Sequence, residues 1–264
     1  VKENMDRRAA WVSAAIASLL LAAGCKPKSS APIRVAAAAD LAHAFDELRP
    51  AFNAKNPSEV TVTIGSSGLL AKQIGEGAPF DLFLAANTNY VDQVVKAGIC
   101  DGSTEHSYAR GRLVIWLKST DGAGLPLAAL ADPRFKRIAI ANPEHAPYGV
   151  AARDALTKAG IWGRVSERIV YGENVQQTLE LAKTGNADVA IIGLSLALAQ
   201  PQGSWSLVDE ASYAPIDQSL AVCTHGENTA GGRKLAEFLS APEGRTILRK
   251  YGFLLPGEAV AKVP

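Results

Sequence analysis

Four short segments rich in small residues stand where an apolar run ends and a helical pattern begins, at 36–41, 65–69, 142–149 and 172–177. The second segment carries two hydroxyl groups, on Ser66 and Ser67, between Gly65 and Gly68, which let the backbone approach a ligand. The first N–H groups of a helix lack intrahelical partners and lie at the positive end of its dipole, so such turns favour an anion. The pattern predicts an anion site built from neutral donors.

Each turn taken alone is equally explained as a helix cap. Ser67 fits an N-cap, and Asn174 with Gln177 fits a capping box that satisfies its own amides. Four such turns contributed by two lobes make the anion site the better interpretation of the set.

The sequence holds none of the patterns that signal catalysis or a bound cofactor. It has no GxGxxG, no P-loop, no HExxH, no CxxC and no GxSxG. Its four histidines have no metal-ligand spacing: His43, His106, His145 and His225. A hydrolase that uses Ser67, His43 or His145, and Asp40 is the enzyme alternative, but it lacks a nucleophile elbow. We therefore expect no enzyme and no cofactor.

The elements that position these turns alternate along the chain. Short apolar runs predict strands at 33–37, 60–64, 81–85, 113–117, 137–141, 168–171, 188–192 and 220–223. Helical spacing predicts helices at 41–52, 70–74, 150–159, 175–183, 233–239 and 242–250. Alternation of this kind gives α/β lobes with parallel sheets, whose ligands bind at the carboxyl ends of the strands. We expect two such lobes with the site in the cleft between them.

Composition excludes other classes of protein. The chain has 264 residues, of which 48% are hydrophobic and 20% charged, as in a folded protein. Its 27 Lys and Arg nearly balance its 26 Asp and Glu. This balance lacks the basic surplus that nucleic acid binding needs, so we expect no nucleic acid partner.

The N-terminal segment predicts export. Lys2, Arg7 and Arg8 precede 15 uncharged residues at 9–23, a run shorter than the roughly 20 residues of a spanning helix. The sequence AAGC at 22–25 resembles a bacterial lipobox, which implies a lipoprotein signal peptide at 1–24, a lipid anchor on Cys25 and a tether at 25–32. The alternative is ordinary signal cleavage near Gly24. Cys100 and Cys223 remain, and the sequence leaves open whether they pair.

The segments AAAADLAHAF, GSSGLLAKQI, GAPFDLFLAA, NPEHAPYGVAARDAL, GENVQQTLELAKTGNADVAII and KYGFLLP, between Ile33 and Pro256, give the chain a family resemblance. It resembles the periplasmic molybdate-binding proteins of ABC transporters. The resemblance implies a type II periplasmic-binding-protein fold, α/β, with two lobes that are each a mostly parallel sheet flanked by helices. It also implies a first lobe at 31–112 plus 224–264 and a second lobe at 113–223.

The same resemblance implies the ligand and its partners. Carried over to this sequence, the ligand-binding residues are Ala39, Asp40, Ser67, Tyr148 and Val175. Ser67 would donate from its hydroxyl and its amide, and Tyr148 and Val175 from their amides at helix starts. The ligand would be molybdate or tungstate, which is also the only metal expected, with sulfate or phosphate as the alternative. The protein would be a monomer on the periplasmic side of the cell envelope that delivers its ligand to a membrane permease.

Two positions depart from the family pattern. Asp40 stands where many members have a hydroxyl or amide side chain, and a carboxylate there would repel a dianion. We therefore expect its side chain to cap the helix that begins at Leu41 and to point away, leaving the amides of Ala39 and Asp40 toward the ligand. Gly193 replaces a Tyr that some members contribute, and the hydroxyl of Tyr148 could compensate.

Overall fold

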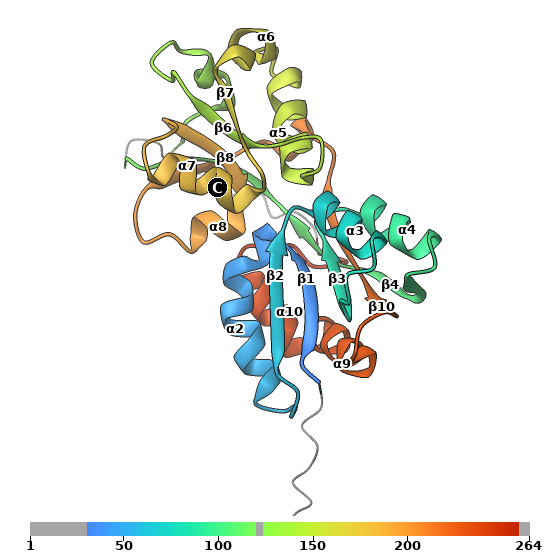
Figure 1. Cartoon of the computed structure of the whole chain (residues 1–264). Helices are drawn as coiled ribbons and strands as arrows, with labels where there is room; N and C mark the ends of the chain where they lie inside the picture. Colours follow the sequence, from blue (N-terminus) through green and yellow to red (C-terminus); the bar gives the residue numbers. More distant parts are fainter. Residues whose placement is uncertain (1–30, 120–123, 259–264) are drawn as a thin grey trace, which may run out of the picture. The chain divides into compact units, whose positions relative to one another are not determined.

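The structure, a computed structural model, describes residues 31–119 and 124–258 (Figure 1). The described residues all belong to one compact unit of the chain. The predicted signal peptide, Cys25 and most of the tether lie outside the described residues. Among those that are described, no helix is long and apolar enough to cross a membrane, and no cluster of three or more His, Cys, Asp or Glu could hold a metal ion.

The first sheet has five strands in the order β2-β1-β3-β10-β4. They are β1 (Ile33–Ala38), β2 (Val60–Gly65), β3 (Leu82–Ala85), β4 (Cys100–Gly111) and β10 (Ile216–Cys223). Alternate side chains enter opposite cores: Leu82 and Leu84 pack on one face of the sheet, while Phe83 and Ala85 pack on the other. The first core includes α2 (Ala42–Asn53), α9 (Thr229–Ser240) and α10 (Pro242–Lys250), and the second includes α3 (Ser67–Gly75) and α4 (Thr88–Lys96).

The second sheet also has five strands, in the order β7-β6-β8-β5-β9. They are β5 (Leu113–Leu117), β6 (Ile138–Ala141), β7 (Ile169–Gly172), β8 (Val189–Gly193) and β9 (Ser204–Leu207). The helices are α5 (Pro147–Lys158), α6 (Trp162–Val165), α7 (Val175–Lys183) and α8 (Leu194–Leu198), with short 3₁₀ turns at Leu127–Ala131, Ser166–Arg168 and Glu210–Ser212. β5, β6 and β8 are buried throughout, as their continuous apolar sequences predict.

Both sheets are mixed, where the resemblance implied mostly parallel ones. In each sheet two neighbouring pairs are parallel and two are antiparallel. β4 and β9 were not predicted because their residues are polar and only partly buried. The predicted boundaries put residues 216–223 in the second lobe, whereas β10 pairs with β3 and β4 in the first sheet. The division into lobes otherwise stays a prediction, and below the first and second lobes are the elements of the two sheets.

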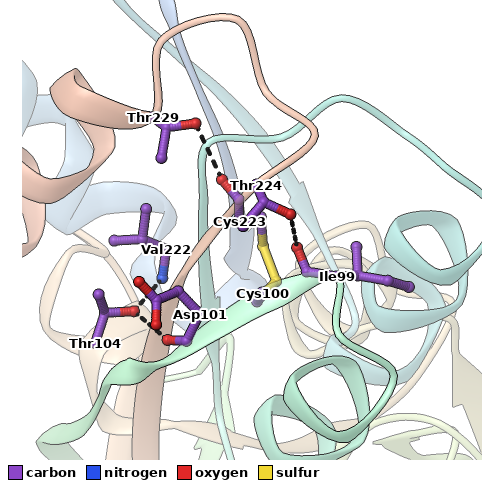
Figure 2. Close-up of a disulfide and its surroundings, with 8 residues drawn as sticks. All are labelled: Ile99, Cys100, Asp101, Thr104, Val222, Cys223, Thr224 and Thr229. Carbon is purple, nitrogen blue, oxygen red and sulfur yellow. Dashed lines mark hydrogen bonds between the residues drawn. A yellow bond between two sulfur atoms is a disulfide. The ribbon is translucent and has the colours of Figure 1, made fainter.

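A disulfide joins the two cysteines that the sequence left open (Figure 2). Cys100 begins β4 and Cys223 ends β10, and the antiparallel register sets them directly opposite each other. Both are buried, and Thr224 beside them donates from its backbone N–H to the carbonyl of Ile99 over 2.9 Å. The two cysteines are 123 residues apart in sequence, and all strands of the second sheet lie between them along the chain.

Candidate oxyanion site

All five predicted ligand residues line one small cavity. Ala39 and Asp40 come from the short 3₁₀ helix η1 (Ala39–Leu41), Ser67 from the start of α3, Tyr148 from α5 and Val175 from α7. The rest of the lining consists of Ala, Gly, Ser, Pro and Asn residues, so no basic side chain of the described residues lines it. The cavity measures about 10 Å³, the space of about one water-sized sphere.

Ser67 is positioned as a donor toward the cavity. Its side chain is buried, and its hydroxyl oxygen accepts a hydrogen bond of 2.9 Å from the backbone N–H of Ala86. A serine hydroxyl carries one donor and two acceptor positions. Because Ala86 occupies an acceptor position, the hydroxyl proton is left for another partner.

Three backbone N–H groups at helix starts are also left without partners. On α7, Asn174 caps the amides of Gln176 and Gln177, as the predicted capping box requires, but not that of Val175. Neither Val175, nor Ser67 on α3, nor Tyr148 on α5 has a hydrogen-bond acceptor for its amide within the described ranges. Unpaired amides at the positive ends of three helices are what a bound anion would satisfy.

The prediction that Asp40 caps a helix is wrong. The helix α2 begins at Ala42, and neither it nor η1 has a side-chain cap. Instead Oδ2 of Asp40 accepts hydrogen bonds from the hydroxyl of Tyr148, over 2.9 Å, and from Nε2 of Gln218. Tyr148 lies 108 residues away in sequence, so these tertiary donors outcompete the local cap. Oδ1 is buried and has no hydrogen-bond partner.

Burial dominates the electrostatics of this carboxyl. Removal from water raises the pKa of Asp40 from 3.8 to about 6, and the hydrogen bonds from Gln218 and Tyr148 oppose that rise only in part. Burial and the neighbouring carboxylate raise the pKa of Tyr148 and that of Tyr108 well above the ordinary value. Both phenols are therefore neutral donors.

Gln218 and Tyr108 complete a network that the sequence analysis missed. The hydroxyl of Tyr108 donates to Oε1 of Gln218 over 2.6 Å, which turns Nε2 of the same amide toward Asp40. Gln218 has no solvent exposure. The only available signal was an amide in a strand that is otherwise largely apolar, at 216–223.

The hydroxyl of Tyr148 is committed to Asp40, so it does not stand free as the extra donor that we considered. Its ring packs against two glycines. A Cβ at Gly111 would lie 2.0 Å from the Tyr148 hydroxyl oxygen, and one at Gly193 would lie 3.1 Å from its ring. Gly193, where some family members place a Tyr, here makes room for Tyr148.

Contacts between the lobes surround the cavity. Gly68 donates from its backbone N–H to the carbonyl of His145 over 2.9 Å, and the hydroxyl of Ser66 bonds Nδ1 of the same histidine over 2.8 Å. A Cβ at Gly68 would lie 2.8 Å from that carbonyl oxygen. Gly68 therefore permits the approach of the lobes, whereas we expected it to permit approach to a ligand. His145 bonds Ser66 and not Ser67, so the described residues do not form the suggested hydrolase arrangement.

A larger cavity of about 470 Å³ adjoins the small one and shares Ala86 and Pro147 with it. Its described lining includes Asp154 and Asp217, which pair with Arg153 and Arg110. Ser67, Tyr148 and Val175, whose amides are unpaired, are not among the described residues that line it, so the smaller cavity is the better oxyanion site.

The fold and this site together define a solute-binding protein of the type II periplasmic-binding-protein fold, with donors from both lobes around one cavity. The sequence profile of the bacterial extracellular solute-binding protein family matches residues 33–254, and the chain belongs to this family. Its similarity extends to named relatives. It is 32% identical to the molybdate-binding protein ModA of Rhodobacter capsulatus, over 86% of this chain and 90% of the relative.

A second relative, the molybdate-binding protein ModA of Azotobacter vinelandii, is 30% identical over 85% of this chain and 90% of its own length. Among solved structures, the periplasmic molybdate-binding protein of Azotobacter vinelandii superposes with a TM-score of 0.79 at 28% identity, covering 85% of this chain and 99% of that one. The match therefore extends over both sheets and the elements that line the cavity.

Proposed function

We propose that this protein is the substrate-binding component of an ABC transporter and that it captures molybdate or tungstate in the small cavity. The observation that carries the proposal is the convergence of Ala39, Asp40, Ser67, Tyr148 and Val175 on one cavity that is lined by no basic side chain of residues 31–119 and 124–258. The relatives named as molybdate-binding proteins support the same ligand class.

The donor set suits a dianion. Molybdate and tungstate carry no proton at neutral pH, so they need hydrogen-bond donors around their oxygens. The hydroxyl of Ser67 and the free amides of Ser67, Tyr148 and Val175 are such donors, and three of them stand at positive helix ends. This chemistry requires no catalytic group and no cofactor, and we assign neither.

Titration calorimetry of the Ala31–Pro264 form against molybdate, tungstate, sulfate and phosphate tests the proposal. Molybdate and tungstate should bind with higher affinity than the other two and should raise the melting temperature. A ligand that binds only the folded state stabilises it by about 2.7 kcal/mol at 100 times its Kd. Neither heat nor a thermal shift with millimolar molybdate and tungstate would overturn the assignment.

The proposal places the protein on the periplasmic side of the cell envelope, as a monomer that delivers its ligand to a membrane permease. The lipobox-like AAGC at 22–25 supports a lipid anchor on Cys25. A diacylated cysteine supplies the two chains that stable anchoring needs. The full chain made in a Gram-negative host should fractionate with membranes and carry covalent lipid, and Cys25→Ser should release it. Recovery of the unsubstituted chain in the soluble fraction with an unmodified Cys25 would contradict the anchor.

A further inference from the structure

Asp40 lines a cavity built for an anion and has one buried carboxylate oxygen without a hydrogen-bond partner. Its side chain is 1% exposed and lines the cavity. Oδ2 accepts from Tyr148 and Gln218, whereas Oδ1 is buried without a partner. A buried polar atom without a partner is costly, so the site lacks a group that this oxygen should meet.

Two acceptor oxygens cannot share a hydrogen bond unless a proton stands between them. We infer, on the basis of the proposed function, that the site takes up one proton together with its oxyanion: Oδ1 of Asp40 is protonated in the complex and donates to an oxygen of the ligand. The proton comes from solvent, and no bond within the ligand forms or breaks. Asp40 thereby becomes a further donor in place of a repelling charge.

The hydrogen-bond network determines which carboxyl oxygen receives the proton. Tyr108 donates to Oε1 of Gln218, so the Nε2 group of that amide can only donate to Asp40. The Tyr148 hydroxyl donates to the same Oδ2. Both donors require Oδ2 to stay an acceptor, which leaves Oδ1 as the position of the proton. Burial favours the neutral carboxyl and gives the ligand-free protein a pKa of about 6 for Asp40.

Among the described residues, no basic side chain contacts the Asp40 carboxyl or the side chains that donate to it. Four neutral side chains contact Asp40 or its partners, from α5, β10, β4 and α8: Tyr148, Gln218, Tyr108 and Ser195. The backbone carbonyl of Asp40 accepts from the hydroxyl of Ser195 over 2.7 Å. β2 and α8 contain no charged residue. Most charged side chains on the neighbouring α2, α5, α7 and β10 pair with other groups: His43 with Asp46, Glu47 with Lys250, Arg153 with Asp154, Glu180 with Lys183 and Asp217 with Arg110. Of the other two, Lys158 donates to the backbone carbonyl of Ala211, and Arg49 is exposed on α2.

The pH dependence of binding follows from this proton. Below about pH 6 the carboxyl is already protonated, so molybdate affinity should be constant. Above about pH 6 the complex holds a proton that the free protein lacks, so Kd should rise by up to about tenfold per pH unit. Molybdate itself stays a dianion across this range and contributes no titration.

Three variants of the Ala31–Pro264 form separate the proton from other causes. In Asp40→Asn, the amide oxygen can accept from Tyr148 and Gln218 while the NH₂ group donates from the Oδ1 position. This variant should bind molybdate about 100-fold more tightly than the unsubstituted protein at about pH 8, with no dependence on pH. Asp40→Ala should also be independent of pH but bind more weakly than Asp40→Asn, because it has no donor.

His145→Gln is the matched control, since the His145 ring bonds the hydroxyl of Ser66, which lines the cavity. In this variant, the Kd for molybdate should depend on pH as it does in the unsubstituted protein.

Calorimetry of molybdate binding at about pH 7.5, in buffers of different ionisation enthalpy, gives the proton count directly. The unsubstituted protein should take up about one proton per ligand and Asp40→Asn none. Molybdate binding with a constant Kd from about pH 5.5 to about pH 8.5 and no proton uptake would overturn this inference while leaving the proposed function intact. Absence of molybdate and tungstate binding by every variant at every pH would overturn the proposed function itself.

Discussion

The two sides of the cavity differ in chemistry and in how they are built. One side consists of helix starts, where Ser67, Tyr148 and Val175 present neutral donors created by a local turn. The other side is Asp40, an acidic side chain held by Tyr148 and Gln218 from distant parts of the chain. The comparison teaches that a local motif can build the donors of an anion site, whereas the charge in that site depends on tertiary contacts.

Asp40→Asn should have the largest effect on the stability of the ligand-free protein. A pKa of about 6 in place of 3.8 means that the folded state binds more protons than the unfolded state between these pH values. Stability therefore falls as pH rises through this window and stays low above it, at a cost of roughly 3 kcal/mol. The Asn side chain of the variant cannot ionise, so the stability of the variant should not fall in this pH window.

Chemical denaturation at about pH 8 should accordingly find Asp40→Asn more stable than the unsubstituted protein by up to roughly 3 kcal/mol, and the gap should close at about pH 4. A variant that is less stable than the unsubstituted protein at both pH values would mean that the carboxylate is stabilised, and the contrast between the two sides would fail.

Ser67→Ala should affect ligand affinity on the donor side. The lost hydroxyl leaves a ligand oxygen without a hydrogen bond, which costs about 1.5–3 kcal/mol and weakens molybdate binding at least about tenfold. The free energy of unfolding should fall by less than the free energy of binding, because within the protein the variant loses only the hydrogen bond that the Ser67 hydroxyl accepts from the N–H of Ala86. Calorimetry and thermal melting measure the two effects separately. Unchanged affinity with lowered stability would make Ser67 a structural residue only.

Asn174→Ala should have the smallest effect on binding. Asn174 caps the amides of Gln176 and Gln177, so its loss should lower stability by about 1 kcal/mol. The amide of Val175 remains, so molybdate affinity should change little. A larger loss of affinity would place the side chain of Asn174 itself on the ligand, which would extend the donor side beyond the backbone.

The turns that hold the helix-start residues could be predicted because a strand, a small-residue turn and a helix follow one another in the chain, and the family resemblance then selected Ser67, Tyr148 and Val175 within them. The helix at 175–183 has the predicted bounds, and the turn before it lines the cavity. Gln218 and Tyr108 could not be predicted in the same way, because β10 and β4 meet only through sheet pairing. The orientation of Asp40 was wrong for that reason: a cap is the local solution, and its real partners lie 108 and 178 residues away.

The disulfide has a mechanical consequence. Cys100 and Cys223 close a covalent ring that contains the whole second sheet, from Leu113 to Leu207, and both crossings between the sheets. A force that pulls on the two ends of the chain passes through the sulfur–sulfur bond and bypasses everything inside the ring. Tension would therefore load the elements outside the ring, which are β1, β2, β3 and the helices α2, α3, α4, α9 and α10, while the second lobe stays unstretched. Reduction of the one bond would place all of the chain under load.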